Sequence, residues 1–529
     1  MMRSLRKEEQ KMSELMQTPC VDTQNMVNSK PQTRQTLLRQ ENYPFFGIAS
    51  GLYALFYTFC MYRNAAGITF PFFIAGSLFF FCLCMKKLET AIKKDSVFYM
   101  AGMILLGLST VCTADGRIIF FNHVGVLLLM ISFLLHQFYQ DGNWRFGRYL
   151  LSVLATMFGA IGEIAKPFTD YALYRSKGVK KNPKLLYVAI GLCIMIPLFL
   201  VVWFLLMTAD RIFMDLTERF FDTIDAVNIF GVVCSIVLMF LLSYGVLAYL
   251  SHRYLEDEVT EKKKHESILA VTITLPLTLL YMVFCGVQVF CLFLGNVSLT
   301  NMTYAEYARQ GFFQLLFICI LNLAMVLIGG HYFKESRVLK IVLTAMSVCT
   351  YVMIFSSGYR MILYIQHYYL TFLRILVLWA LGVIFLLLTG VLIHIYAPRF
   401  PLFRYGVAVV TVCYIVLSFS KPDHLIATCN LANTDDATVH GFFDADAYHD
   451  YGYLSGLSAD AAPVVLPYLK GQGYDMTATA PREIYRRHEA DQWGYFYMDH
   501  LREDVEKNGI RTFNFSRWYA GRILESLKK

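Results

Sequence analysis

Four charged residues in the second half of the chain lie beside long apolar runs and could do chemistry there. Glu306 and Arg309 stand in the polar island NMTYAEYARQGFF, and Arg360 and Arg374 occur in SSGYRMILYIQHYYLTFLRILVLW. An arginine at membrane depth costs about 2.5 to 3.5 kcal/mol unless it pairs or reaches the interface. We therefore expect Glu306 to pair with Arg360 or Arg374 at the outer membrane surface. Such a cluster would either lock the helices together or hold an anionic headgroup.

A second group of side chains has the chemistry of a cation site. The stretch HGFFDADAYHDYGY contains His440, Asp444, Asp446 and His449. Carboxylate and imidazole ligands at this density could hold a divalent cation. The spacing matches neither an EF-hand nor a zinc ribbon, however, and aspartates are common in exposed loops. The pattern therefore favours an ordinary loop, and the sequence predicts no cofactor.

Three further titratable residues lie inside or beside apolar segments. Glu163 could be a proton or cation site, although a helix cap or a partner for Lys166 fits its position better. His123 and His136 lie near the two ends of one apolar run and could relay protons. We expect these two histidines to be satisfied by neighbouring helices.

The elements that must position these residues are membrane helices. Of the 529 residues, 57% are hydrophobic and only 16% are charged, and the mean hydropathy is +0.48. A soluble domain has about 25% charged residues, so a soluble fold is excluded. Helices of about 20 apolar residues cross the hydrocarbon core and satisfy their own backbone. We predict an all-α polytopic protein with eleven spans, near 44–62, 66–85, 97–114, 118–139, 185–208, 228–250, 267–294, 311–330, 340–359, 372–395 and 405–420.

The net charge of +8 reflects membrane topology rather than nucleic-acid binding. Lysines and arginines gather in alternate loops, for example at Lys86 and Lys87, at 262–264 and at Arg399 and Arg404. Cytoplasmic loops of membrane proteins carry such an excess. We therefore predict a cytoplasmic N-terminal tail at 1–43, a helical bundle at 44–420 and an extracytoplasmic C-terminus.

The segment at 149–168 interrupts this alternation. It has only 14 uncharged residues between Arg148 and Glu163, and both of its flanks are basic. A full crossing would place one basic loop outside. We therefore predict an interfacial or re-entrant helix there.

The composition changes abruptly after Ser420. Residues 421–529 contain few long apolar runs and many tyrosines, aspartates and arginines, which predicts a small helical extracytoplasmic domain. Ser458 is the expected N-cap of one helix, and Ser516 is expected just before another.

Several motifs resemble those of a bacterial multi-pass membrane family known only as a domain of unknown function, numbered 4173, and a related one numbered 4153. They are LTNMTYAEYARQGFFQLLFICILNLAMV, SGYRMILYIQHYYLTFLR, KPDHLIATCNLA, YGYLSGLSADAAPVVLPYL and RTFNFSRWYAGRIL. Tyr369 stands where that family has a glycine, and His424 where alanine is common. The resemblance implies a multi-pass topology and a bacterial cell membrane, and it brings no established activity or cofactor.

The functional prediction is a non-enzymatic one. The chain has no P-loop, nucleophile elbow, kinase motif or HExxH. A lipid-linked glycosyltransferase would need acidic residues in an early outer loop, and the second outer loop supplies only Asp115. We predict an envelope-associated scaffold or sensor whose partners are the lipid bilayer and, at the outer face, an envelope protein or an anionic lipid headgroup. The alternative is a transporter or lipid-handling protein that uses the outer Glu/Arg cluster, with an intramembrane transferase third.

Overall fold

The computed structural model describes residues 33–140, 146–178, 226–252, 265–290, 311–432, 452–478 and 493–528, with residue 144 and scattered positions between 195 and 214. These residues form helices joined by short turns. The only β-type pairing among them is an isolated bridge between His265 and Phe333. The predicted all-α class is therefore confirmed.

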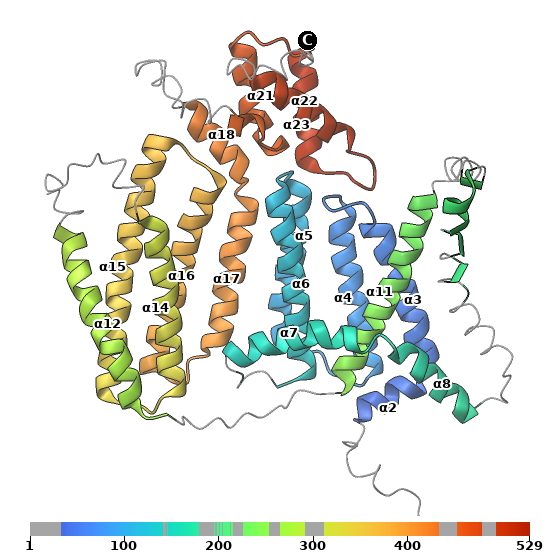
Figure 1. Cartoon of the computed structure of the whole chain (residues 1–529), viewed down its shortest axis with the longest axis horizontal. Helices are drawn as coiled ribbons and strands as arrows, with labels where there is room; N and C mark the ends of the chain where they lie inside the picture. The colour runs from blue at the N-terminus through green and yellow to red at the C-terminus, as the bar shows by residue number, and fades with distance from the viewer. Residues whose placement is uncertain are drawn as a thin grey trace, which may run out of the picture.

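Ten helices of the described chain are long and apolar enough to cross a membrane. They run parallel or antiparallel to one another (Figure 1). These helices are α3 (Tyr43–Met61), α4 (Thr69–Lys87), α5 (Val97–Cys112), α6 (Gly116–Phe138), α11 (Ala226–His252), α12 (Ser267–Gln288), α14 (Phe312–Tyr332), α15 (Arg337–Tyr368), α16 (Phe372–Tyr396) and α17 (Leu402–Phe419). Each matches one predicted span, and most of the remaining span, 185–208, lies outside the described residues.

Two shorter helices occupy the place of the predicted interfacial segment. α7 (Phe146–Gly162) and α8 (Lys166–Gly178) are bent by 60° relative to each other. In Figure 1, α7 lies across the ends of the vertical helices. Its Leu151 and Phe158 are exposed while Tyr149 and Val153 are buried, so one apolar side faces outward. An interfacial role for this segment stays a prediction.

The spanning helices enclose two hydrophobic cores. The first is built from α3 to α7 with α11, and the second from α12, α14, α15 and α16. α17 packs on both α16 and α5 and lies between the two groups in Figure 1. Its Val407 and Tyr414 contact the first core, and its Cys413 carbonyl accepts a 2.9 Å hydrogen bond from Trp379 of α16. α17 is therefore the structural bridge between the two halves.

The C-terminal helices form a third core on one end of the bundle, called here the upper face (Figure 1). They are α18 (Pro422–Ala432), α21 (Ala462–Gly471), α22 (Trp493–Glu506) and α23 (Phe515–Lys528). Ala114, from the turn between α5 and α6, is part of this core, and Phe372 of α16 packs against it. The C-terminal helices are therefore packed onto the bundle rather than held away from it.

The opposite, lower face has a buried ion pair of its own. Arg39 of α2 (Arg34–Glu41) donates from Nε to Asp170 Oδ2 of α8 at 2.9 Å, and both side chains are 1% exposed. Tyr244 of α11 donates to the same carboxylate oxygen at 2.9 Å. This contact fixes α2 and α8 against α11.

Candidate functional site

Four charged residues meet where the C-terminal helices contact the upper face, and we call them the junction cluster: Asp115, Arg117, Asp423 and Asp460. Asp115 precedes α6, Arg117 lies in its first turn, Asp423 lies at the start of α18, and Asp460 lies in the short turn Ala459–Ala461 before α21. All three aspartates are 1% to 2% exposed. Buried carboxylates are costly unless they are paired or hydrogen-bonded, so the partners of each one define this site.

Arg117 is the cation of the junction cluster. Its Nε and Nη2 donate to the two oxygens of Asp115, both at 2.9 Å. Its Nη2 also donates to Asp423 Oδ1, and its guanidinium stacks 4.1 Å from the centre of the Phe372 ring. Bidentate pairing combined with stacking is particular to arginine, and here it joins the bundle to α18.

Asp423 carries the connection into the C-terminal core. Its second oxygen accepts a 2.9 Å hydrogen bond from the backbone N–H of Ser458. Burial, and next the negative charge of Asp115, raise the pKa of the Asp423 carboxyl above its ordinary value, against the opposing effect of Arg117. The ionised form of Asp423 is therefore held at a cost, and Arg117 limits that cost.

Asp460 is satisfied by hydrogen bonds alone. Its Oδ1 accepts from the Ala114 N–H at 3.2 Å and from the Ser516 hydroxyl, and its Oδ2 accepts from the Thr113 hydroxyl. No lysine or arginine of the described residues forms an ion pair with it. Two of these donors belong to the turn between α5 and α6, so this carboxylate binds the bundle to α21 and α23.

Asn514 completes the attachment. Its amide donates to the carbonyls of Ala66, Thr110 and Thr113 at 3.2, 3.1 and 2.8 Å. Its side-chain oxygen accepts from the N–H of Ser516 at 3.0 Å and so caps α23. The predicted place of Ser516 before the helix was wrong: Asn514 is the cap, and the Ser516 hydroxyl turns to Asp460 instead.

A buried polar network continues from the junction into the bundle. Asn122 of α6 donates to the Thr110 hydroxyl of α5 at 2.9 Å. Its side-chain oxygen accepts from the hydroxyls of Tyr414 and Ser418 of α17, both at 2.8 Å. Ser418 also contacts the Ser109 hydroxyl at 2.5 Å. These contacts link the bridge helix α17 to the two helices that carry the junction.

The outer cluster predicted from the sequence lies partly outside the described residues, because Glu306 and Arg309 do. Arg360 is 6% exposed and donates from Nη2 to Gln288 of α12 at 2.9 Å. Arg374 donates to the carbonyls of Tyr368 and Tyr369. The two arginines share no partner among these contacts, and the predicted pairing with Glu306 stays a prediction.

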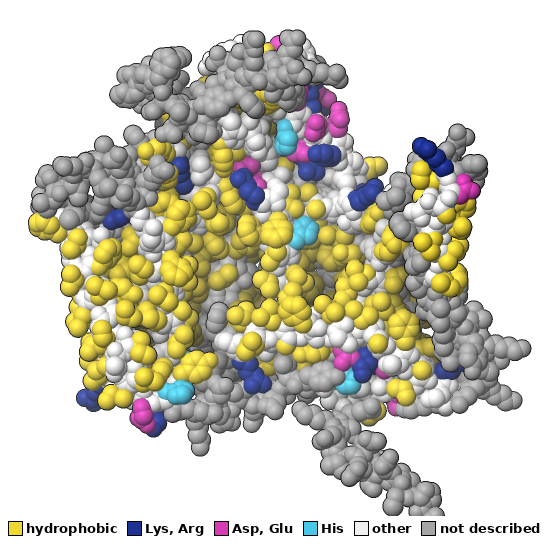
Figure 2. Space-filling view, viewed as in Figure 1, with side chains coloured by type: hydrophobic (Ala, Val, Ile, Leu, Met, Phe, Trp, Pro, Cys, Tyr) yellow, Lys and Arg dark blue, Asp and Glu magenta, His cyan; other side chains and the backbone are white. Residues whose placement is uncertain are grey.

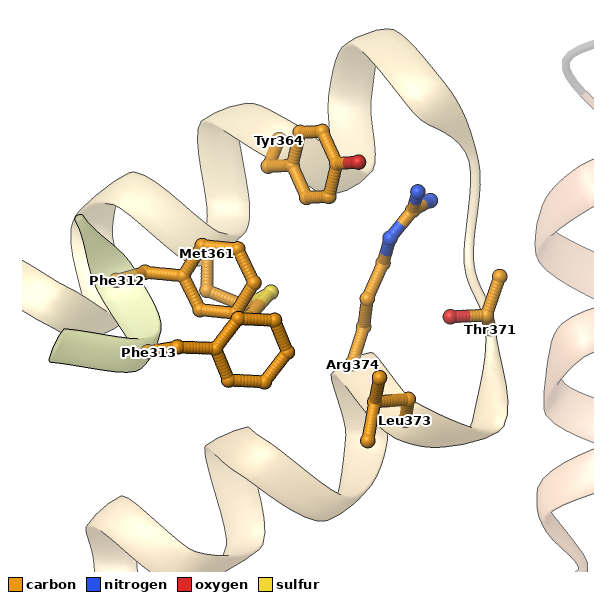
Figure 3. Close-up of a pocket in the computed structure, with 7 residues that line it drawn as sticks. All are labelled: Phe312, Phe313, Met361, Tyr364, Thr371, Leu373 and Arg374. Atoms are coloured by element: carbon orange, nitrogen blue, oxygen red, sulfur yellow. The ribbon is translucent and has the colours of Figure 1, made fainter. Parts of the chain in front are cut away.

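Arg374 lines a cavity of about 330 Å³ at the upper ends of α14, α15 and α16. Figure 3 shows the rings of Phe312 and Phe313 on one side, Tyr364 above, and the Arg374 side chain running up beside them. The guanidinium lies 4.2 Å from the centre of the Tyr364 ring. The cavity is therefore apolar and aromatic with one cation in its wall.

The remaining sequence candidates have ordinary surroundings or lie outside the described residues. His440, Asp444, Asp446 and His449 are all outside, and no group of three metal-ligating side chains occurs in the part of the chain that the structure describes.

The titratable residues of the apolar segments are engaged. Glu163 lies 3.5 Å from the Lys166 ammonium, as the pairing prediction expected. His123 contacts the Ile119 carbonyl through Nδ1 at 2.7 Å and stacks on Phe70, and the ring of His136 lies 5.7 Å from that of Tyr99. Each of these three residues therefore contacts a neighbouring group, and the satisfaction of both histidines by other helices stays a prediction.

Sequence reasoning missed the junction cluster as a unit. Asp423, Asp460 and Ser516 each lie in one of the motifs quoted above, and Asp115 was noted as an acidic residue of an outer loop. The available signal was that three separate motifs each contain an acidic or small polar residue that takes part in the junction. Nothing in the sequence showed that they meet, because Thr113 and Asp460 are 347 positions apart.

A sequence profile described as a domain of unknown function, DUF4153, matches residues 100–468, which is more than two thirds of the chain. The match begins inside α5, ends inside α21 and includes the whole junction cluster. It does not show a relation to the family numbered 4173. No curated protein and no solved structure matches the chain significantly.

Proposed function

The chain belongs to the DUF4153 family, and we propose that it is a multi-pass membrane sensor or scaffold whose C-terminal helices are mechanically coupled to the bundle. The observation that carries this proposal is the junction cluster. Five of its six carboxylate oxygens accept a hydrogen bond that crosses the junction or holds Arg117 in place, and the sixth, Asp423 Oδ2, accepts from Ser458 within the C-terminal helices. Buried polar networks of this kind favour one arrangement of the parts that they join.

The route of the coupling is short. α17 ends at Phe419, and Asp423 follows four residues later on α18. Between them, Lys421 has a φ of +50°, so the chain turns sharply there. A displacement of the C-terminal helices would therefore act directly on α17, which bridges the two cores.

The charge distribution supports an orientation in which the lower face is cytoplasmic and the C-terminal helices are extracytoplasmic, in a bacterial cell membrane. The helix ends and loops of the lower face contain many cations (Figure 2). They are Lys86, Lys87, Lys93, Lys94, Arg148, Lys166, Arg175, Lys334, Arg337, Lys340, Arg399 and Arg404. An excess of lysine and arginine marks the cytoplasmic side. In this orientation, the upper face would meet ligands or envelope partners.

The coupling can be tested with spin labels at the lower face. Ile92, between α4 and α5, and Glu335, between α14 and α15, are both exposed and belong to different halves of the bundle. Cysteines would replace them in a chain without its native cysteines, and the distance distribution between the labels would be measured by pulsed electron resonance. With Asp460→Asn, which weakens the junction at the opposite face, we expect the distribution to shift or broaden.

The matched control is Asp475→Asn, because the Asp475 side chain is exposed and bonds only within its own turn. It should leave the distribution unchanged. If Asp460→Asn loosens the C-terminal helices, as shown by proteolysis, yet the label distances stay those of the wild type, the coupling proposal is wrong.

The alternative of a transporter would be favoured by a helix broken near the membrane midplane. Residues 274–288 contain Pro276 and Gly286 and could form such a break, but α12 continues through Pro276 without interruption. The lipid-handling alternative has one feature in its favour, which is the cavity beside Arg374.

A further inference from the structure

The cavity beside Arg374 has a cation that no acidic side chain of the described chain neutralises. No ion pair involves Arg374 among the described residues, whereas Arg117 contacts two carboxylates. The Nη1 group of Arg374 is occupied by the carbonyls of Tyr368 and Tyr369. Its Nε and Nη2 have no partner among the described residues, so two donor groups remain for an external anion.

The arginine is held in place before any ligand arrives. Its two backbone contacts lie at the end of α15, and its guanidinium stacks on Tyr364 at 4.2 Å. A fixed planar fork loses little conformational entropy when it binds an oxyanion such as a phosphate. The geometry is that of an anion site rather than of a mobile surface arginine.

An apolar path leads away from the cavity along α14. Phe313 lines the cavity and is 48% exposed, and Phe317, one turn further into the bundle, is 66% exposed. Ile320 and Leu321 follow on the same side and are exposed as well. Residues at positions i, i+4 and i+7 or i+8 share one helix face. The path therefore starts at the cation and runs toward the membrane interior.

We propose that this cavity binds an anionic phospholipid, with its phosphate against Arg374 and one acyl chain along the exposed face of α14. Charge complementarity selects the phosphate, and the continuous apolar face selects a lipid over a soluble phosphate. A volume of about 330 Å³ is enough for a headgroup and not for a whole lipid, which agrees with chains that stay in the bilayer. The site is independent of the coupling proposed above.

The test is lipid binding by the purified full chain in detergent, measured by native mass spectrometry. Phosphatidylglycerol would be titrated into the wild type, Arg374→Gln, Phe313→Glu and Arg404→Gln. Arg404 is the matched control, because it is an exposed arginine at the lower face paired with Asp95. Loss of charge-assisted hydrogen bonds to the phosphate predicts about tenfold weaker binding for Arg374→Gln.

Phe313→Glu is a second test of the cavity, which is needed in case Arg374→Gln does not fold. It leaves the contacts of Arg374 with α15 intact and supplies an acid that competes with the phosphate, so binding should also fall. Diacylglycerol with the same chains lacks the phosphate and should bind weakly. Soluble glycerol 3-phosphate has the phosphate without the chains and should not displace phosphatidylglycerol at equal concentration.

Three results would overturn the assignment. The first is equal phosphatidylglycerol binding in all four proteins, and the second is diacylglycerol binding as tight as that of the phospholipid. The third is displacement by glycerol 3-phosphate at equal concentration, because it would assign the cavity to a soluble phosphate. The label distances across the bundle report on the coupling alone, so either proposal can fail without the other.

Discussion

Two arginines at the upper face show how the same side chain serves two purposes. The guanidinium of Arg117 stacks 4.1 Å from the ring centre of Phe372, and that of Arg374 stacks 4.2 Å from that of Tyr364. Arg117 has two carboxylate partners, whereas Arg374 is bonded to two backbone carbonyls. Stacking alone therefore does not distinguish a structural arginine from one that is ready for a ligand. The acidic residues around it do.

The presence or absence of carboxylate partners also gives the junction cluster and the cavity different energetic roles. In the junction cluster, removal of the cation would leave buried acids uncompensated, so the stability of the fold depends on Arg117. At the cavity, removal of the cation would leave no acid of the described residues without its partner, because none of them pairs with Arg374. Variants of the two arginines should therefore differ in stability far more than their similar surroundings suggest.

The largest effect should come from Arg117→Ala. Without the guanidinium, the buried carboxylates of Asp115 and Asp423 lose their shared partner. Because the Arg117 side chain is itself 39% exposed, we expect a loss at the low end of the range for a buried pair, about 3 kcal/mol in the free energy of unfolding. Chemical unfolding in detergent would measure it. Arg404→Ala removes an exposed pair with Asp95 and should cost less than about 1 kcal/mol. Similar losses in the two variants would contradict the view of Arg117 as the partner of two buried carboxylates.

The next effect should come from Asn514→Ala, which leaves three carbonyls at the junction without their donor and removes the cap of α23. We expect a loss of about 2 to 3 kcal/mol. Thr477→Ala is the control, because the exposed Thr477 hydroxyl bonds only to Asp475 in its own turn. Asn514→Ala should also expose residues 493–528 to protease sooner. Equal protection in the two variants would mean that Asn514 does not attach these helices.

A smaller effect should appear as a pH dependence of Arg117→Ala. The pKa of Asp423 is raised by burial in the folded state, so the folded protein binds this proton more tightly than the unfolded chain. Its contribution to stability is therefore greatest at low pH and is lost as the pH rises from the unfolded pKa toward the folded one. Because Arg117 lowers that pKa, its loss should strengthen the effect.

Unfolding measured at about pH 7 and about pH 5 would show this difference. Arg117→Ala should recover part of its lost stability at the lower pH, and the wild type should gain less. A variant that loses further stability on acidification would contradict the sign.

The smallest effect should be a gain from Tyr369→Gly. Tyr369 has φ of 63° and ψ of 177°, in a region that glycine alone adopts readily. Tyr369→Ala is the reference, because it removes the same ring and keeps the strain. Relief of the strain should make the unfolding free energy of Tyr369→Gly about 1 kcal/mol larger than that of Tyr369→Ala. No difference between the two variants would show that the turn is unstrained.

Much of the fold could be predicted from the sequence, because apolar length is a local property. The ten described spans, the short helix α7 and the cap at Ser458, which accepts from the Asp460 N–H, all follow from neighbouring residues. The glycine that the resembling family places at 369 also agrees with the positive φ there. Such features depend on the backbone of a few residues.

The junction could not be predicted in this way. Asp115, Asp423 and Asp460 look like ordinary loop or cap residues in the sequence, and only tertiary packing buries them together. Ser516 was placed at a helix start by its type, while the structure uses Asn514 there because its amide also reaches three carbonyls of the bundle. Residue type indicates a cap, but long-range partners decide which residue serves as one.

The most direct test of the contrast between the two arginines is thermal unfolding of the wild type, Arg117→Ala and Arg374→Gln in detergent, with and without phosphatidylglycerol. We predict that Arg117→Ala unfolds at a much lower temperature and still gains stability from the lipid. Arg374→Gln should unfold near the wild-type temperature without lipid and gain little from it. A strongly destabilised Arg374→Gln that still responds to the lipid would contradict the account.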